Sequence, residues 1–107
     1  MKKSSFDLYE RFFKALSNKT RFEIISLLKK EPKNVKEISK QLKFEQSRVS
    51  HNLNKLECFG FVTCKSEGKQ RIYSLDKKYV LPIINKINKY LIKYDKRLEE
   101  CSKNLKI

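Results

Sequence analysis

The chain has 107 residues and a mass of 12.8 kDa, which suits one domain and leaves no room for two independent cores. Apolar residues make up 39%, enough to bury a core and too many for a disordered tail. No apolar run approaches the ~18 residues of a membrane span, and the first residues do not resemble a signal peptide. We therefore expect a cytoplasmic protein with no membrane partner.

The composition also argues against an enzyme. The chain has one histidine, His51, three separated cysteines, no Cys-x-x-Cys pair and no glycine-rich phosphate loop. These residues do not provide a nucleophile, a base and a group to orient the base. The formal net charge of +14 instead favours a polyanionic partner such as nucleic acid. Because basic residues occur along the whole chain, the charge does not locate a site.

The N-terminal third predicts two helices. Apolar residues first recur at helical spacing at Phe6, Tyr9, Phe12, Phe13 and Leu16. Asn18 is a suitable N-cap for a second helix, and Pro32 follows its last turn and stops it. The apolar side of this second helix is formed by Phe22, Ile25, Leu27 and Leu28.

The next segment predicts two helices joined by a tight turn. Asn34 and Glu37 form a pattern like a capping box at the start of a short helix over 35–42. After a break at 43–45, a fourth helix runs over about 46–59, with Val49, Leu53 and Leu56 as its buried stripe. Gly60 can end this helix in a left-handed conformation. The pair over 35–59 is therefore expected to be a helix-turn-helix.

Two strand-like runs, 61–65 and 70–75, follow with a polar, basic link that contains Gly68. They predict a β-hairpin. The order of these elements is that of a winged helix-turn-helix, a mainly α fold with a small β-hairpin as the wing, and we expect a single domain over 1–107 with the wing at about 61–75.

The last segment, about 81–105, predicts one long helix with apolar residues at the a and d positions of three heptads. These residues are Ile84, Ile87, Leu91, Tyr94, Leu98, Cys101 and Leu105. Packing onto its own domain is the alternative, but the stripe is longer than one small winged helix can cover. We interpret it as half of a symmetric dimer interface, with the first helix alongside.

Three motifs resemble the ArsR/SmtB family of small dimeric repressors from bacteria and archaea. They are KALSNKTRF at 14–22, VSHNLNKLECFGFV at 49–62, and the wing with Gly68 and RIYSL at 71–75. The resemblance covers roughly residues 6 to 100. Its motifs distinguish the family well from unrelated folds and less well from other winged-helix regulators such as the MarR type. The resemblance implies a dimer that binds DNA through the fourth helix and the wing, under control of a ligand that is often a metal.

Outward-facing positions of the fourth helix supply groups that can contact bases and phosphates, and wing cations can reach the flanking backbone. A solvated polar face is the alternative interpretation. His51 changes charge near neutral pH, so DNA binding can depend on pH. The predicted DNA-binding residues are Gln46, Ser47, Arg48, Ser50, His51, Asn54, Lys55, Lys65, Lys69 and Arg71.

Two positions depart from the family pattern. Glu45 stands where a serine usually caps the recognition helix, and Asn52 stands where the second of two polar residues is often histidine. Glutamate is a poorer cap, and its charge repels phosphate, although it suits the helix dipole. We expect both departures to affect base preference.

The metal sites best known in the family are not expected here. Asn34 and Lys36 occupy the positions of the Cys-x-Cys motif, and the last helix has no histidine. No cofactor is predicted, although Cys58, Cys64 and Cys101 could bind a soft metal ion or respond to redox state. The alternative, which we favour, is that they are structural thiols kept reduced in the cytosol.

The predicted function is that of a sequence-specific, double-stranded DNA-binding transcriptional regulator, a dimeric repressor on an inverted-repeat operator. The alternatives are a nonspecific architectural DNA-binding protein of the same fold and a thiol-based repressor that responds to metal or redox state. A protein-interaction adaptor that has lost DNA binding is a further class. The sequence does not indicate an inducer.

Overall fold

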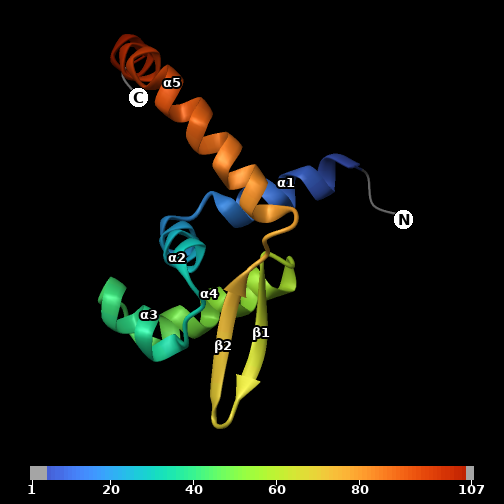
Figure 1. Ribbon diagram of the computed structural model, residues 1–107. Coiled ribbons are helices and arrows are strands. Elements are labelled where there is room, and N and C mark those ends of the chain that lie inside the picture. The colour runs from blue at the N-terminus through green and yellow to red at the C-terminus, as the bar shows by residue number, and fades with distance from the viewer. Residues whose placement is uncertain (1–4, 106–107) are drawn as a thin grey trace. The chain divides into compact units, whose positions relative to one another are not determined.

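The computed structural model describes residues 5–105, and the side chain of Leu105 lies outside the described part. In chain order the elements are α1 (Ser5–Leu16), α2 (Lys19–Lys30), α3 (Val35–Leu42), α4 (Gln46–Cys58), β1 (Val62–Glu67), β2 (Gln70–Leu75) and α5 (Val80–Leu105) (Figure 1). This order confirms the predicted mainly α winged helix-turn-helix. None of the helices in this part of the chain is both long and apolar enough to cross a membrane.

The chain forms two compact units. The first ends at Asp76 and contains α1 to α4 and the hairpin, and the second begins at Lys77 and contains α5. The single domain over 1–107 stays a prediction. The positions of the two units relative to one another are not determined.

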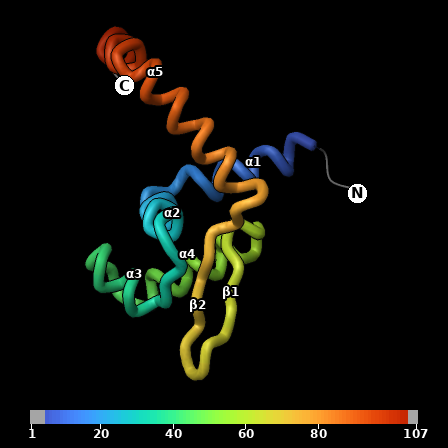
Figure 2. The backbone as a smooth tube through the Cα atoms, viewed as in Figure 1, coloured from blue at the N-terminus to red at the C-terminus, as the bar shows by residue number. Residues whose placement is uncertain are grey.

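The core of the first unit is built around α2, which packs against α1, α3, α4 and β2 (Figure 2). Ile24 and Ile25 have no exposed surface, and Leu28 is 2% exposed. The predicted apolar side omitted Ile24 and included Phe22 and Leu27, which are only half-buried. The prediction was incomplete because neighbours cover α2 on more than one side. Each fully buried aliphatic side chain contributes about 1.5–3 kcal/mol to folding.

The turn between α3 and α4 is set by local hydrogen bonds. Asn34 Oδ1 accepts from the Glu37 backbone N–H at 2.8 Å, and Glu37 Oε1 accepts from the Asn34 N–H at 2.9 Å. This confirms the predicted capping box at the start of α3. Lys43 adopts a left-handed conformation with φ 59°, which ends α3. The Ser39 hydroxyl donates to the Phe44 carbonyl and holds the turn.

Helix α4 ends at Cys58, one residue before the predicted boundary. Gly60 has φ +77°, as expected for a residue that reverses the chain after a helix. Its N–H donates to the Glu57 carbonyl at 2.9 Å, and the Phe61 N–H donates to the Leu56 carbonyl at 2.9 Å. These bonds satisfy carbonyls at the end of α4 and lead directly into the wing.

The wing is an antiparallel hairpin whose register runs from Val62 opposite Leu75 to Glu67 opposite Gln70. Its turn therefore consists of Gly68 and Lys69, and Gly68 has φ +63°, which suits a two-residue hairpin turn. Strand β1 extends to Glu67, two residues beyond the predicted end, because the pairing continues up to the turn. An isolated bridge also pairs Lys33 with Tyr73.

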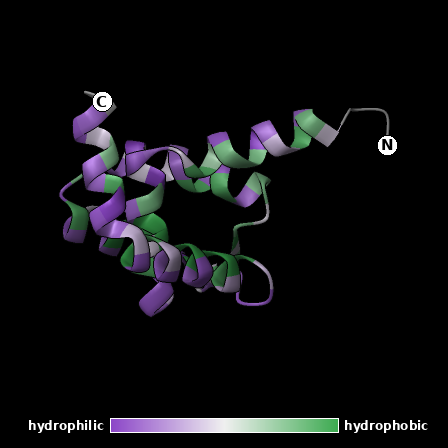
Figure 3. Ribbon diagram, turned by 90° about the horizontal axis from the view of Figure 1, so that it is seen from above, coloured by the Kyte–Doolittle hydropathy of each residue, from purple (hydrophilic) through white to green (hydrophobic). Residues whose placement is uncertain are grey.

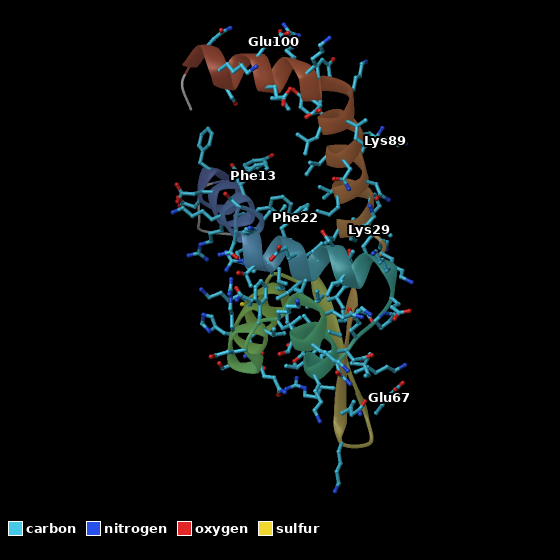
Figure 4. All side chains as sticks on the ribbon, turned by 90° about the vertical axis from the view of Figure 1, so that its left-hand side faces the viewer. Phe13, Phe22, Lys29, Glu67, Lys89 and Glu100 are labelled. Carbon is cyan, nitrogen blue, oxygen red and sulfur yellow. The ribbon has the colours of Figure 1, made fainter. Side chains whose placement is uncertain are left out.

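The second unit contains α5, which begins at Val80, one residue before the predicted start. Pro82 lies in its first turn, where no intrahelical N–H bond is needed. The helix changes direction between the segment with Lys89 and the segment with Glu100 (Figure 4). The predicted stripe is therefore not straight over three heptads.

Candidate nucleic-acid interface

Helix α4 separates a buried side from a polar side. Val49, Leu53 and Leu56 have no exposed surface, so the opposite side of the helix faces away from the core. Of the predicted contact residues on α4, Ser50 is half-buried, and the exposed ones are Gln46, Ser47, Arg48, His51, Asn54 and Lys55. The structure thus brings these side chains together on one outward surface. Their contact with DNA stays a prediction.

Arg48 is exposed but held by two neighbours. Its Nη2 donates to the Thr20 hydroxyl at the start of α2. Its guanidinium carbon lies 3.8 Å from the centre of the Phe44 ring, which is a close cation–π contact. Arg48 is therefore fixed beside the turn between α3 and α4, which reduces the entropy that a further ligand would have to remove.

Asn52 has a structural role that the sequence analysis missed. It is only 7% exposed, and its Nδ2 donates to the Arg48 carbonyl at 2.9 Å. Its Oδ1 accepts from Arg21 Nη1 at 3.4 Å. The residue lies on the inner side of α4, and its effect on base preference stays a prediction. Its helical position, close to the buried stripe of Val49 and Leu53, was the available signal.

Arg21 joins three helices through the same guanidinium. Besides the bond to Asn52, its Nε donates to the Ala15 carbonyl at 2.7 Å and its Nη2 donates to the Lys14 carbonyl at 3.1 Å. These carbonyls belong to the last turn of α1, where a cation is favourable. Arg21 therefore fixes the end of α1 against α2 and α4.

Glu45 precedes α4 and makes no side-chain capping hydrogen bond. This agrees with the expectation that glutamate is a weak cap at this position. The residue is exposed, so its negative charge remains at the start of the helix, beside Gln46 and Ser47.

The wing carries Lys65, Lys69 and Arg71, all exposed. Arg71 Nε donates to Cys64 Sγ at 3.2 Å. This bond, with the nearby Tyr73, raises the pKa of Arg71 above its ordinary value, so its cation is maintained. Burial raises the pKa of Tyr73, and Cys64 adds to this effect, whereas the Arg71 cation opposes it.

The three cysteines are free thiols, with Cys58 and Cys101 exposed and Cys64 half-buried. No three His, Cys, Asp or Glu side chains within residues 5–105 are grouped so that they could hold a metal ion. A metal or redox role of the cysteines stays a prediction.

The predicted dimer-interface residues of α5 differ in exposure. Ile84 is 2% exposed, and its part in a dimer interface stays a prediction. Ile87 and Tyr94 are half-buried, whereas Leu91, Leu98 and Cys101 are exposed. The dimer interface on α5 stays a prediction.

Residues 18–63, from the N-cap of α2 to the start of β1, match the family described as "Bacterial regulatory protein, arsR family". This segment is therefore similar to the ArsR family. A second match is 36% identical over 61 residues to an uncharacterized HTH-type transcriptional regulator of Methanocaldococcus jannaschii. That match covers 57% of this chain but only 16% of the length of the archaeal protein.

Solved structures extend the similarity beyond the matched segment. Rv0081 of M. tuberculosis has a TM-score of 0.82 and 26% identity, covering 90% of this chain and 98% of its own. A homodimeric winged helix-turn-helix DNA-binding domain from Mycobacterium bovis, a possible ArsR-family regulator, has a TM-score of 0.75 and 26% identity over 89% and 85% of the two chains. HlyU from Vibrio cholerae has a TM-score of 0.71 and 28% identity over 84% and 97%.

Proposed function

We propose that the protein is a dimeric, sequence-specific, double-stranded DNA-binding transcriptional regulator that represses genes from an inverted-repeat operator. The observation that carries the proposal is the polar surface of α4, which stands opposite three fully buried residues and follows a tight turn from α3. Family and fold point to a regulator rather than an enzyme. We place its action in the cytoplasm.

In this proposal α4 lies in the major groove, which is wide enough to admit an α-helix. Gln46 and Ser47, at the start of the helix, contact base edges, as is usual for recognition helices. His51 and Asn54 lie further along the same exposed surface. Lys55 and Arg48 bind phosphates, and the wing cations contact the flanking backbone.

Exposed apolar residues support the dimer. On α1, Phe6 is 84%, Tyr9 62% and Phe13 57% exposed, and hydrophobic and hydrophilic residues alternate along this helix (Figure 3). On α5, Leu91 is 45% and Leu98 42% exposed. Exposed large apolar side chains on each of these helices suit an interaction surface. A two-fold dimer presents two recognition helices about one DNA turn apart, which calls for an inverted repeat.

The test is a titration of the reduced protein against DNA from upstream of its own gene. A scrambled fragment of the same composition is the control, and both are measured at two salt concentrations. Binding tightly to the native fragment alone supports a specific regulator. Equal binding to both fragments that collapses with salt supports the architectural alternative instead.

The thiol alternative uses the same complex. Cys58 is exposed at the end of α4, close to the proposed DNA surface. This alternative is supported if Cd²⁺, diamide or peroxide releases the protein from DNA. The release should then no longer occur when Cys58, Cys64 or Cys101 is replaced by serine. Release that persists in all three variants would exclude the cysteines as the cause.

A further inference from the structure

A basic pocket lies within the first unit, where the second half of α1, the start of α2 and the end of α4 meet. It has a volume of about 310 Å³ and is lined by Arg11, Lys14, Ala15, Arg21, Lys55, Cys58 and Phe59. We propose that the basic pocket binds a small organic anion, a carboxylate or sulfonate on an aromatic or aliphatic body. Its volume falls at the lower end of small-molecule sites.

The charge of the lining selects an anion. Four of the seven lining residues are cations and none is acidic. Within residues 5–105, Arg11 and Lys55 form no salt bridge. Lys14 pairs with Glu10 at 3.7 Å, but both side chains are largely exposed, so this pair is weak. Unpaired cations around one cavity attract and orient a negative group.

The floor of the pocket is apolar, which favours an organic anion over inorganic phosphate or sulfate. Ala15 is buried, and Phe59 is 43% exposed. The Phe59 ring stacks on Phe61 with centroids 5.5 Å apart and an interplanar angle of 19°, and Phe61 is itself only 3% exposed. Phe59 is therefore held in place and offers surface to an apolar ligand body.

Arg21 makes part of the pocket rigid. Its bonds to the Ala15 and Lys14 carbonyls and to Asn52 hold the guanidinium between α1 and α4. A cation fixed in this way loses little conformational freedom when a ligand binds. Two further lining cations, Arg11 on α1 and Lys55 on α4, are exposed and can approach the anion from two helices.

On α1, the cations of the pocket point away from the exposed apolar residues proposed for the dimer. At about 100° per residue, the direction of Arg11 and Lys14 on α1 lies roughly 140° from that of Phe6, Tyr9 and Phe13. A second copy that packs on Phe6, Tyr9 and Phe13 therefore approaches α1 from the side away from Arg11 and Lys14.

A regulatory consequence rests on the proposed function. Lys55 lines the pocket and is also a predicted phosphate contact. A bound anion neutralises this cation and lowers DNA affinity, so the pocket would act as an effector site. Ligand binding itself does not depend on DNA and is measured on the free protein.

The first test uses anilinonaphthalene sulfonate, an aromatic sulfonate whose fluorescence reports binding. Replacing Arg11 and Lys55 together by glutamine should raise the dissociation constant at least about fivefold. The matched control replaces Lys29 and Lys36, exposed residues outside the pocket, and should change it less than about twofold. Equal weakening in both variants would show general charge attraction and overturn the proposal. Sodium sulfate should displace the probe no more than sodium chloride of the same ionic strength does. Stronger displacement by sulfate would indicate a site for inorganic anions instead.

A second readout is the reactivity of Cys58, measured with Ellman's reagent, an aromatic dicarboxylate disulfide. The Cys58 sulfur attacks the reagent's S–S bond, forms a mixed disulfide and releases the nitrothiobenzoate anion. In single-cysteine variants, naphthalene sulfonate should slow labelling of Cys58 and leave Cys101 unaffected. Unchanged Cys58 labelling at saturating naphthalene sulfonate would contradict the pocket. Failure of the DNA titration alone would leave this result intact.

Discussion

Lys33 and Tyr73 exchange a pair of backbone hydrogen bonds. The Lys33 N–H donates to the Tyr73 carbonyl at 3.1 Å, and the Tyr73 N–H donates to the Lys33 carbonyl at 2.9 Å. The bridge joins the segment between α2 and α3 to strand β2. A side-chain bond from Asn34 Nδ2 to Gln70 Oε1 at 3.2 Å lies nearby. The wing is thus anchored to the start of the helix-turn-helix, which sets the position of its cations.

Replacing Lys33 by proline should destabilise the first unit by about 1–3 kcal/mol, because it removes the backbone N–H that donates to the Tyr73 carbonyl. Lys33→Met keeps the backbone bond and most of the buried stem, and removes only the 3.1 Å pair with the exposed Glu31. It should change stability by less than about 1 kcal/mol. Urea unfolding measures the free energy of unfolding of both variants. Equal losses in the two variants would show that the backbone bridge does not contribute to stability.

Neighbouring positions of α4 should separate stability from DNA binding. Asn52→Ala leaves Arg21 with one acceptor fewer and should lower the unfolding free energy by about 1–3 kcal/mol. His51→Ala, at an exposed position, should stay within about 0.5 kcal/mol of the parent while weakening operator binding. Thermal unfolding and DNA titration together check this. A stable Asn52→Ala protein would argue that the network with Arg21 contributes little.

Lys69→Ala should weaken binding to every DNA sequence similarly, because the wing tip contacts the backbone. The slope of log affinity against log salt should fall by about one for each Lys69 in contact. Lys29→Ala, at the end of α2, removes the same charge away from the proposed surface and is the control. If the two variants retain equal slopes, the wing does not contact phosphate.

Leu91→Asp should dissociate the dimer, because it places a charge at an exposed position of the apolar stripe on α5. Operator affinity should fall steeply as the two recognition helices lose their linkage. Ile92→Asp, at a 79% exposed position outside the a and d positions, is the control. Analytical ultracentrifugation gives the mass, and a monomer that binds the operator as tightly as the parent would exclude the dimer mechanism.

The raised pKa of Tyr73, caused first by burial, predicts alkaline sensitivity. The unfolded tyrosine ionises near pH 10, whereas the folded one holds its proton to higher pH. Relative to Tyr73→Phe, the parent should therefore lose stability as pH rises from about 10 to the folded pKa, and no further above it. The difference between the two unfolding free energies isolates this group from the lysines. A pH-independent difference would mean that Tyr73 has an ordinary pKa.

The predicted helices, turn and hairpin agreed with the structure because each depends on local patterns. The Asn34 capping box, the break at 43–45 and the left-handed Gly60 all involve residues a few positions apart. The exposed side of α4 followed in the same way from helical spacing against Val49, Leu53 and Leu56. Element ends were off by one or two residues, because pairing and last-turn bonds decide them.

The sequence by itself determined the order of the elements and the polar surface of α4, because helical periodicity and capping depend on residues close together in the chain. Only the tertiary structure decided that Asn52 is buried and accepts a hydrogen bond from Arg21. It also revealed the bridge from Lys33 to Tyr73 and the basic pocket at α1, α2 and α4. These features join residues far apart in sequence, and their energies depend on distances and burial that no local pattern encodes.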